Sequence, residues 1–94
     1  MALLVNIGFG NLVSSEKLVA IVSPDAAPIR RLVQSARESG RCIDGTQGRK
    51  TKSVLIMEQD IIVLSALVPE TIAKRFHSGA YADADPAGAL LQAE

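Results

Sequence analysis

The centre of the chain reads Cys42-Ile43-Asp44-Gly45-Thr46-Gln47-Gly48-Arg49-Lys50-Thr51-Lys52-Ser53-Val54-Leu55-Ile56-Met57. Two apolar runs enclose a polar stretch that contains two glycines. Because glycine takes positive φ at little cost, Gly45 and Gly48 allow this stretch to fold back and expose its peptide N–H groups. Three bases follow the glycines, with no acidic residue among them: Arg49, Lys50 and Lys52. The pattern predicts a cationic loop between two strands, suited to binding phosphate.

Apolar runs typical of β-strands lie on both sides of this loop. The sequence predicts five short strands, at residues 3–7, 18–22, 41–44, 53–57 and 61–67. Because these runs are largely apolar rather than alternating, both faces of the sheet are expected to be covered. Glu58-Gln59-Asp60 is predicted to be a turn that joins residues 54–57 and 61–64 in an antiparallel hairpin.

The first helix is predicted to follow the second strand and to run to about Ser39. We choose Asp25 over Ser23 as its N-cap, because Pro28 then stands at N3, where no intrahelical donor is lost. Gly40 is the natural C′ residue after the helix. The i, i+3, i+4, i+7 rule predicts the core-facing residues Ile29, Leu32, Val33 and Ala36. One flank is predicted to carry Arg30, Gln34 and Arg37.

The second helix is predicted to begin with Pro69 at N1 and to end near Phe76. From His77 to Glu94 the composition is dominated by Ala, Gly, Asp and Pro, with three acids and no Lys or Arg. Residues 77–94 are therefore expected to form a flexible acidic tail. The predicted fold is α+β, a small mostly antiparallel sheet of about five short strands with two helices in residues 1–76.

The composition predicts self-association. A chain of 94 residues buries only about 60–65% of its unfolded surface, so a single core of this size is marginal. Yet 48% of the residues are hydrophobic and the mean hydropathy is +0.24, which is more apolar material than one small core usually absorbs. Burying the surplus against copies of the same chain predicts a homo-oligomer.

The net charge is zero, but the charges are unevenly distributed. Between Arg30 and Lys52 lie seven bases and two acids, a local balance of +5. A cationic centre followed by an acidic segment indicates a polyanion site, while a solvated surface with ordinary Arg content stays equally open on charge alone. Cys42 is the single cysteine and is expected to behave as a small buried hydrophobe in a reducing compartment.

Targeting and membrane segments are not predicted. The apolar start at residues 1–5 lacks a basic region and is cut short by Asn6 and Gly8, so it does not resemble a signal peptide. No apolar run approaches the roughly 18 residues of a membrane span. The expected location is the cytoplasm.

Catalysis, metals and cofactors are not predicted. Gly8-Phe9-Gly10 lacks the third glycine and the helix of a dinucleotide fingerprint, so we expect a tight turn whose Phe9 plugs the core or a subunit contact. Residues 45–51 lack the Gly-Lys-Ser/Thr ending of a phosphate-binding P-loop. His77 is the single histidine and has no Cys pair to build a metal site. Glu58 and Asp60 lack a partner base, so no small-molecule substrate is expected.

Nucleic acid is the best remaining partner. With three aromatic residues, a stacking platform for single strands is not expected, and duplex phosphates are the better target. Lys17, just before the second strand, is predicted to join the loop if the strand ends come together. One subunit offers about three to five phosphate contacts, which is weak at physiological salt, but identical loops repeated around an assembly would raise the avidity.

Several blocks of the sequence resemble the extracellular matrix regulatory protein RemA family over roughly residues 3–76. They are Asn6-Ile7-Gly8-Phe9-Gly10-Asn11, Ile21-Val22-Ser23-Pro24, Ala27-Pro28-Ile29, Ile43-Asp44, Gly48-Arg49-Lys50-Thr51, Ser65-Ala66 and Pro69-Glu70-Thr71. The resemblance implies a DNA-binding activator of biofilm-matrix genes in spore-forming bacteria, LytTR-like in fold and assembled as a homo-oligomeric ring.

The family's DNA-contacting positions map onto Lys17, Arg49 and Lys50. Members often carry Arg where this chain has Lys17 and Lys50, so charge is kept while the bidentate geometry of a guanidinium is lost. Pro28 also matches a family position, which we assign to helix start or assembly. Within residues 1–76, Arg49 and Lys50 are thus the primary predicted DNA contacts and Lys17 and Lys52 the secondary ones. Arg30 and Arg31 are predicted as flanking contacts or subunit-interface partners.

Two other readings of the sequence stay open. An oligomeric scaffold for protein binding would use the basic loop for salt bridges to Asp44 or Glu58 of a neighbouring subunit. A sensor of small anions or nucleotides would use residues 45–50 directly, and phosphate ligands would then raise its melting temperature.

Overall fold

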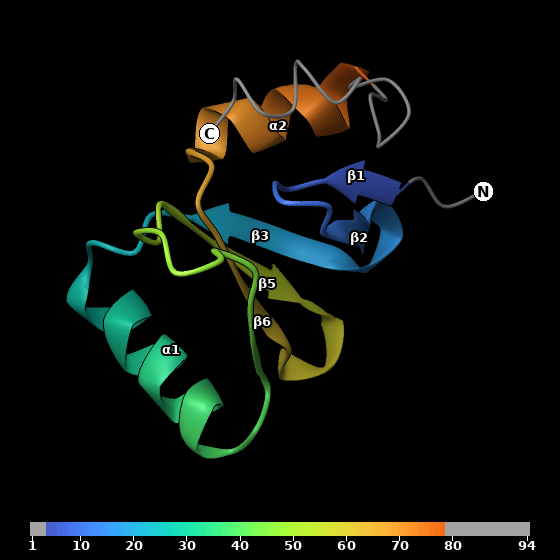
Figure 1. Ribbon diagram of the computed structural model, residues 1–94. Coiled ribbons are helices and arrows are strands. Elements are labelled where there is room, and N and C mark those ends of the chain that lie inside the picture. Colours follow the sequence, from blue (N-terminus) through green and yellow to red (C-terminus); the bar gives the residue numbers. More distant parts are fainter. Residues whose placement is uncertain (1–3, 79–94) are drawn as a thin grey trace.

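The computed structural model describes residues 4–78, which form six strands, two α-helices and two 3-10 turns (Figure 1). The strands are β1 (Leu4–Asn6), β2 (Leu12–Ser14), β3 (Leu18–Val22), β4 (Cys42–Asp44), β5 (Ser53–Met57) and β6 (Ile62–Ser65). The helices are α1 (Ala27–Glu38) and α2 (Pro69–Ser78), and the 3-10 turns are Ser15–Lys17 and Glu58–Asp60. The α+β class is confirmed.

Four strands form the main sheet, in the order β3-β5-β6-β4. The predicted hairpin is confirmed, because β5 pairs antiparallel with β6 and places Leu55 opposite Val63. β3 pairs antiparallel with the other edge of β5, whereas β4 pairs parallel with β6. The sheet is therefore mostly antiparallel, as predicted, with β3 and β4 at its edges.

The expectation of a single sheet with about five strands is wrong in one respect. Residues 12–14 form an additional strand, β2, which pairs antiparallel with β1 to make a separate two-stranded sheet. Its three residues directly follow the Gly8–Asn11 turn, which joins them to β1 in a hairpin that the sequence pattern did not indicate. The hairpin between β1 and β2 turns through the predicted Gly8–Asn11 segment, where the Asn11 amide donates to the Gly8 carbonyl.

The main sheet is covered on both faces, which confirms that expectation. On one face, Val54, Ile62 and Leu64 form a buried cluster with Ala36 of α1. On the other face, Leu55, Met57 and Val63 join residues from the β1–β2 hairpin and from α2. Alternate residues of β5 and β6 therefore enter two different cores, as the pleat of a strand requires. Figure 1 shows α1 on one side of the sheet, and β1, β2 and α2 on the other.

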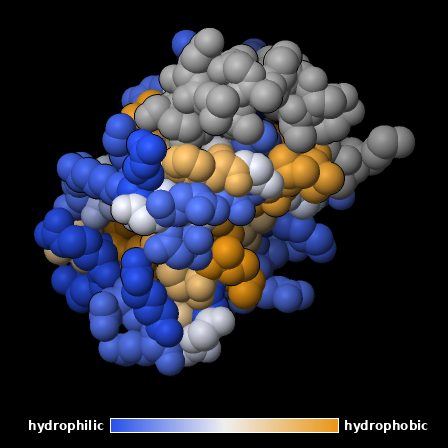
Figure 2. All heavy atoms as spheres, in the orientation of Figure 1, coloured by the Kyte–Doolittle hydropathy of each residue, from blue (hydrophilic) through white to orange (hydrophobic). Residues whose placement is uncertain are grey.

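This covering leaves only part of the surplus apolar surface exposed. The sheet does not need a neighbouring subunit to shield its second face, because the hairpin and α2 already cover it. Exposed large apolar side chains remain at Leu4, Leu12, Val19, Ile43 and Val68. Figure 2 shows apolar atoms exposed near the middle of the view, beside the hydrophilic side chains that cover α1. The argument for self-association therefore rests on these exposed side chains.

The predicted N-cap of α1 is wrong. Ala26, not Asp25, is the N-cap, and no side chain caps the helix, so Pro28 stands at N2 rather than N3. Asp25 lies before the helix because its amide bonds to the hydroxyl of Ser23, which in turn donates to the Asp25 carboxylate. This local turn competes with the helix for the same residues.

The other end of α1 and its core-facing residues follow the prediction. Gly40 has a φ of +76° and its amide donates to Arg37, while the Arg41 amide donates to Ala36. These two bonds form a Schellman motif, which satisfies the last carbonyls of the helix. Ala36 is fully buried, and the other three predicted core residues pack against its cluster.

The last strand and the last helix differ from prediction by a few residues. β6 ends at Ser65, two residues early, because the Ser65 hydroxyl donates to the Ile7 carbonyl and accepts the Leu67 amide, which bends the chain. α2 begins at Pro69 as predicted but continues to Ser78. Residues 79–94 of the predicted acidic tail lie outside the described residues. None of the helices within residues 4–78 is long and apolar enough to span a membrane.

Candidate nucleic-acid interface

The basic loop runs from β4 to β5 and is tied to β6 at both ends. The Gly45 amide donates to the Leu64 carbonyl at 2.9 Å, and the Lys52 amide donates to the Ser65 carbonyl at the same distance. Because β6 lies inside the main sheet, the two ends of the loop are held by a rigid element. The intervening residues are free to project from the sheet.

Asp44 shapes the first half of the loop. One oxygen of its carboxylate accepts hydrogen bonds from the Thr46 hydroxyl at 2.6 Å and from the Thr46 amide at 2.9 Å. These two bonds, the hydroxyl bond first, lower the pKa of Asp44 below its ordinary value. The carboxylate is therefore ionised at neutral pH and holds Thr46 in place, and the Thr46 side chain is buried as a result.

A tight turn then presents the first cation. The Arg49 amide donates to the Thr46 carbonyl, and the two residues between them, Gln47 and Gly48, have φ values of +55° and +81°. Two successive positive φ angles are the pattern of a type I′ turn. The prediction for Gly48 is thus confirmed.

The prediction for Gly45 is wrong, because this glycine does not adopt a positive φ. It is needed for space instead. A Cβ atom at this position would lie 3.0 Å from the Leu64 carbonyl oxygen and 3.0 Å from the Asn11 side-chain nitrogen. The glycine thus allows the loop to pass close to β6 and to the tip of the β1–β2 hairpin.

The hairpin tip supports the loop through two side chains that the sequence did not connect with it. The Asn11 side-chain amide donates to the carbonyls of Gly45 at 3.1 Å and Gly8 at 3.0 Å, which links the two segments. The Phe9 ring lies under the guanidinium of Arg49, 5.7 Å from its centre. Phe9 is only half-buried, so it acts as a platform for Arg49 rather than as the expected plug in the core. A contact of this kind orients the cation without neutralising it.

Three of the predicted contacts gather on one surface. Arg49, Lys50 and Lys52 are exposed and line one shallow recess of about 190 Å³ together with Ala66. A second recess places Lys50 and Lys52 near the start of α2 and the turn before α1. Asp25 and Glu70 also line this second recess, so its charge is mixed. The purely cationic surface is therefore the first recess.

The side chains of Arg30 and Arg31 project from different sides of α1, although the two residues are adjacent in sequence. Arg30 projects from α1 toward the loop side and lines a cavity together with Thr51, and one of its nitrogens donates to the Asp25 carbonyl at 2.8 Å. Arg31 is exposed elsewhere on α1 and lines none of these recesses. Arg30 is therefore a neighbour of the cationic recess, and Arg31 is not.

Lys17 is not brought to the loop within one protomer. It precedes β3, whose first residue Leu18 pairs with Met57 at the end of β5, whereas the loop enters β5 at its start, opposite Val22. Lys17 and the loop therefore lie at opposite ends of the β3–β5 pair. The Lys17 ammonium lies 3.8 Å from the carboxylate of Glu58, and both side chains are exposed. A pair this exposed contributes little to stability.

The described part of the chain offers little for catalysis. Within residues 4–78, no group of three or more His, Cys, Asp or Glu side chains is arranged to hold a metal ion. Glu58 and Asp60 are exposed in their turn, as expected for solvated acids. The arrangement that can bind a ligand is thus an anchored loop that presents three exposed cations.

The chain is similar to a family of known regulatory proteins. The family model described as extracellular matrix regulatory protein A-like matches residues 4–76. A regulatory protein of Geobacillus sp. (strain WCH70) is 52% identical over 73 residues, which cover 78% of this chain and 84% of that protein. A regulatory protein of Caldicellulosiruptor saccharolyticus is 58% identical over 72 residues, covering 77% of this chain and 71% of that protein. One from Clostridium botulinum is 56% identical over 77 residues, covering 82% and 85%. The names of these relatives are regulatory rather than enzymatic.

Proposed function

Because this chain belongs to the RemA-like family of bacterial regulatory proteins, we propose that it regulates transcription by binding duplex DNA as a homo-oligomer. The basic loops grip the phosphate backbone, with Arg49 and Lys50 as primary contacts and Lys52 beside them. The resemblance set out above adds the finer expectation of a ring that activates biofilm-matrix genes. Such a regulator would act in the cytoplasm, where its DNA is.

The observation that carries this proposal is the cationic recess. Arg49, Lys50 and Lys52 converge on it, no acidic residue within residues 4–78 lines it, and the loop that bears the three cations is tied to β6 at both ends. A preorganised loop loses little conformational entropy when it binds, so more of the attraction appears as affinity. Exposed cations on a rigid loop suit the phosphate backbone, which binds through charge and without sequence information.

Self-association is part of the proposal because one protomer makes too few phosphate contacts to bind duplex DNA tightly. Its three loop cations contribute at most about three such contacts, and Lys17 lies at the other end of the β3–β5 pair. In an assembly, the Lys17 of one subunit could approach the same duplex as the loop of another subunit. Repeated loops would also raise the effective concentration of binding sites along the DNA.

The test is a duplex titration at two salt concentrations with the variant Arg49→Ala. We expect weaker binding to all duplex sequences and a salt slope that is shallower by about one unit for each engaged loop, because one phosphate contact is lost. The matched control is Lys74→Ala, which removes an exposed cation from α2, outside the recesses described above. If the affinity of Arg49→Ala for duplex DNA were unchanged and the oligomer intact, the loop would not be part of the DNA site.

The same titration separates the competing function, an oligomeric scaffold that binds protein. A scaffold predicts no salt-dependent retention of duplex DNA. The observation that favours this reading is that Asp44 and Glu58, the acids that the loop would reach on a neighbouring subunit, are both exposed. Among residues 4–78, no acidic side chain lines the cationic recess and competes for the loop cations.

A further inference from the structure

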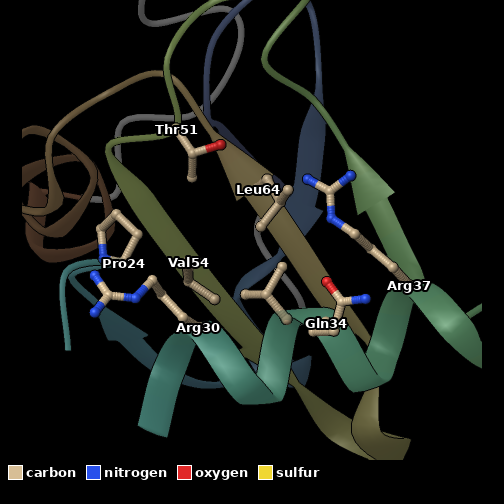
Figure 3. A pocket seen from close by; sticks show the side chains of 8 residues that line it. Pro24, Arg30, Gln34, Arg37, Thr51, Val54 and Leu64 are labelled. Carbon is tan, nitrogen blue, oxygen red and sulfur yellow. The ribbon is translucent and has the colours of Figure 1, made fainter. Parts of the chain in front are cut away.

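The cavity that Arg30 and Thr51 line is separate from the cationic recess and lies between α1 and the main sheet. Its volume is about 260 Å³, and its lining comes from α1, from the turn before α1 and from β5, β6 and the residue Thr51 (Figure 3). The apolar surface of its floor belongs to Val33 of α1 and to Pro24, which are both half-buried. Val54 and Leu64 lie beneath this surface and are shielded from solvent. The floor is therefore apolar and rests on the rigid strands β5 and β6.

The rim of this cavity is polar and positively charged. Figure 3 shows Arg30 and Arg37 at its two ends along α1, with Gln34 between them and Thr51 on the opposite wall. Arg30 donates one bond to a backbone carbonyl, which leaves its charge uncompensated. Across residues 4–78, neither guanidinium forms an ion pair with a carboxylate, although Asp44 lies within electrostatic range of Arg37.

We propose that this cavity is a binding site for a small amphipathic anion, a molecule with an apolar body and a carboxylate or phosphate group. The apolar body would cover the floor, where burial of hydrocarbon is favourable. The anionic group would accept hydrogen bonds from the guanidinium group at one end of the cavity, that of Arg30 or that of Arg37, whose fork matches both carboxylate and phosphate. The volume is just below the range of drug-sized pockets, so the ligand is small, on the order of ten non-hydrogen atoms.

The floor distinguishes this site from the DNA-binding surface. A phosphate backbone is fully hydrated and charged, so it gains nothing from contact with a recessed apolar floor. The proposal goes beyond DNA binding and does not depend on it. A bound ligand would nevertheless touch Thr51, which directly follows Lys50 in the basic loop.

The experiment is an NMR titration of the full chain with phenyl phosphate and with benzoate, which separate the phosphate source from the carboxylate source. At least one probe is expected to shift the amides of residues 30–37, 51, 54 and 64 in a saturable way, at concentrations up to about 10 mM. Inorganic phosphate and benzyl alcohol, which each lack one half of the ligand, are expected to bind at least about tenfold more weakly.

Two variants and one control make the test specific. Arg30→Gln combined with Arg37→Gln keeps the exposed polar surface and should weaken binding at least about tenfold. Gln34→Phe keeps both charges but fills the cavity, and it should abolish binding. Lys74→Gln, on α2, should leave it unchanged. Circular dichroism confirms that each variant is folded.

Three results would overturn the proposal. The first is the absence of saturable shifts at these residues. This result is also expected if a second copy of the chain occupies the cavity, and it overturns the proposal in that case too. The second is wild-type affinity in the double arginine variant. The third is equal affinity for inorganic phosphate and phenyl phosphate, which would make the rim an extension of the DNA surface. DNA binding is measured separately, so a failure here leaves the proposed function standing.

Discussion

Asp44 is the residue whose charge most directly holds the loop. Its two bonds to Thr46 favour the ionised carboxylate, and they lower its pKa below the ordinary value. Because the pKa is lower in the folded state than in the unfolded one, the stabilisation is complete above the unfolded value of about 4 and disappears as the pH falls through the folded value.

We predict that Asp44→Asn lowers the free energy of unfolding at pH 7 by roughly 0.5–1 kcal/mol, since an amide oxygen accepts these bonds less strongly and the side chain is exposed. The difference between variant and wild type should vanish in strong acid. Urea unfolding at several pH values measures it. A difference that stays constant from neutral to acidic pH would contradict the role of the charge.

Substitutions at the two glycines of the loop are predicted to lower the stability of the protein for different reasons. Gly48→Asn should be nearly neutral, because Asn tolerates positive φ, whereas Gly48→Val should cost roughly 1–2 kcal/mol through backbone strain. Gly45→Ala should cost roughly 1–3 kcal/mol, because its Cβ would meet the Leu64 carbonyl. Thermal unfolding compares the three variants. If Gly45→Ala were as stable as wild type, the close approach to β6 would not matter.

At the scale of elements, the β1–β2 hairpin acts as a support for the basic loop. Its tip contributes the Phe9 ring under Arg49 and the Asn11 amide on the Gly45 carbonyl. The hairpin itself is attached to β6, since the Ser65 hydroxyl donates a hydrogen bond to the Ile7 carbonyl at 2.7 Å. The loop, the hairpin tip and β6 therefore form one connected unit.

We predict that Phe9→Leu weakens duplex binding by a few-fold while leaving the fold intact. Leucine keeps most of the apolar volume but removes the aromatic face, which contributes about 0.5–1 kcal/mol to an exposed cation–π contact. Comparison with the double variant Phe9→Leu, Arg49→Ala forms a mutant cycle. If the two effects simply add, Phe9 does not act through Arg49.

At the scale of the whole molecule, the exposed apolar side chains predict where copies of the chain meet. Ile43 is 57% exposed on the edge strand β4, and Leu12 is 42% exposed on β2. Both line a hollow of about 320 Å³ whose other walls include Met57, Ile61 and Val63 and whose rim carries Lys17 and Glu58. An open sheet edge beside an apolar hollow is a common place for association.

We predict that Ile43→Glu lowers the mass of the assembly, because it places a charge in an apolar contact. Lys74→Glu, which also introduces an acid but at an exposed polar position of α2 outside this hollow, is the control. Light scattering with and without duplex DNA measures both variants. Loss of assembly should also weaken DNA binding far more than loss of one loop cation, owing to avidity. An unchanged mass would place the interface elsewhere.

The sequence alone determined the features that depend on near neighbours in the chain. The β5–β6 hairpin, the core-facing residues of α1, its Gly40 terminus and the Pro69 start of α2 all follow from local spacing and backbone preference, and each is confirmed. The cationic character of Arg49, Lys50 and Lys52 was equally visible, as was the family resemblance.

Tertiary structure decided the features that depend on distant segments. Only the fold brings Phe9 under Arg49, Asn11 onto Gly45 and α1 over Val54 and Leu64. It also separates Lys17 from the loop, because the antiparallel pairing of β3 with β5 places them at opposite ends. The physical reason is that these contacts join residues far apart in sequence, and strand register, which no local pattern specifies for strands this short, sets which of them meet.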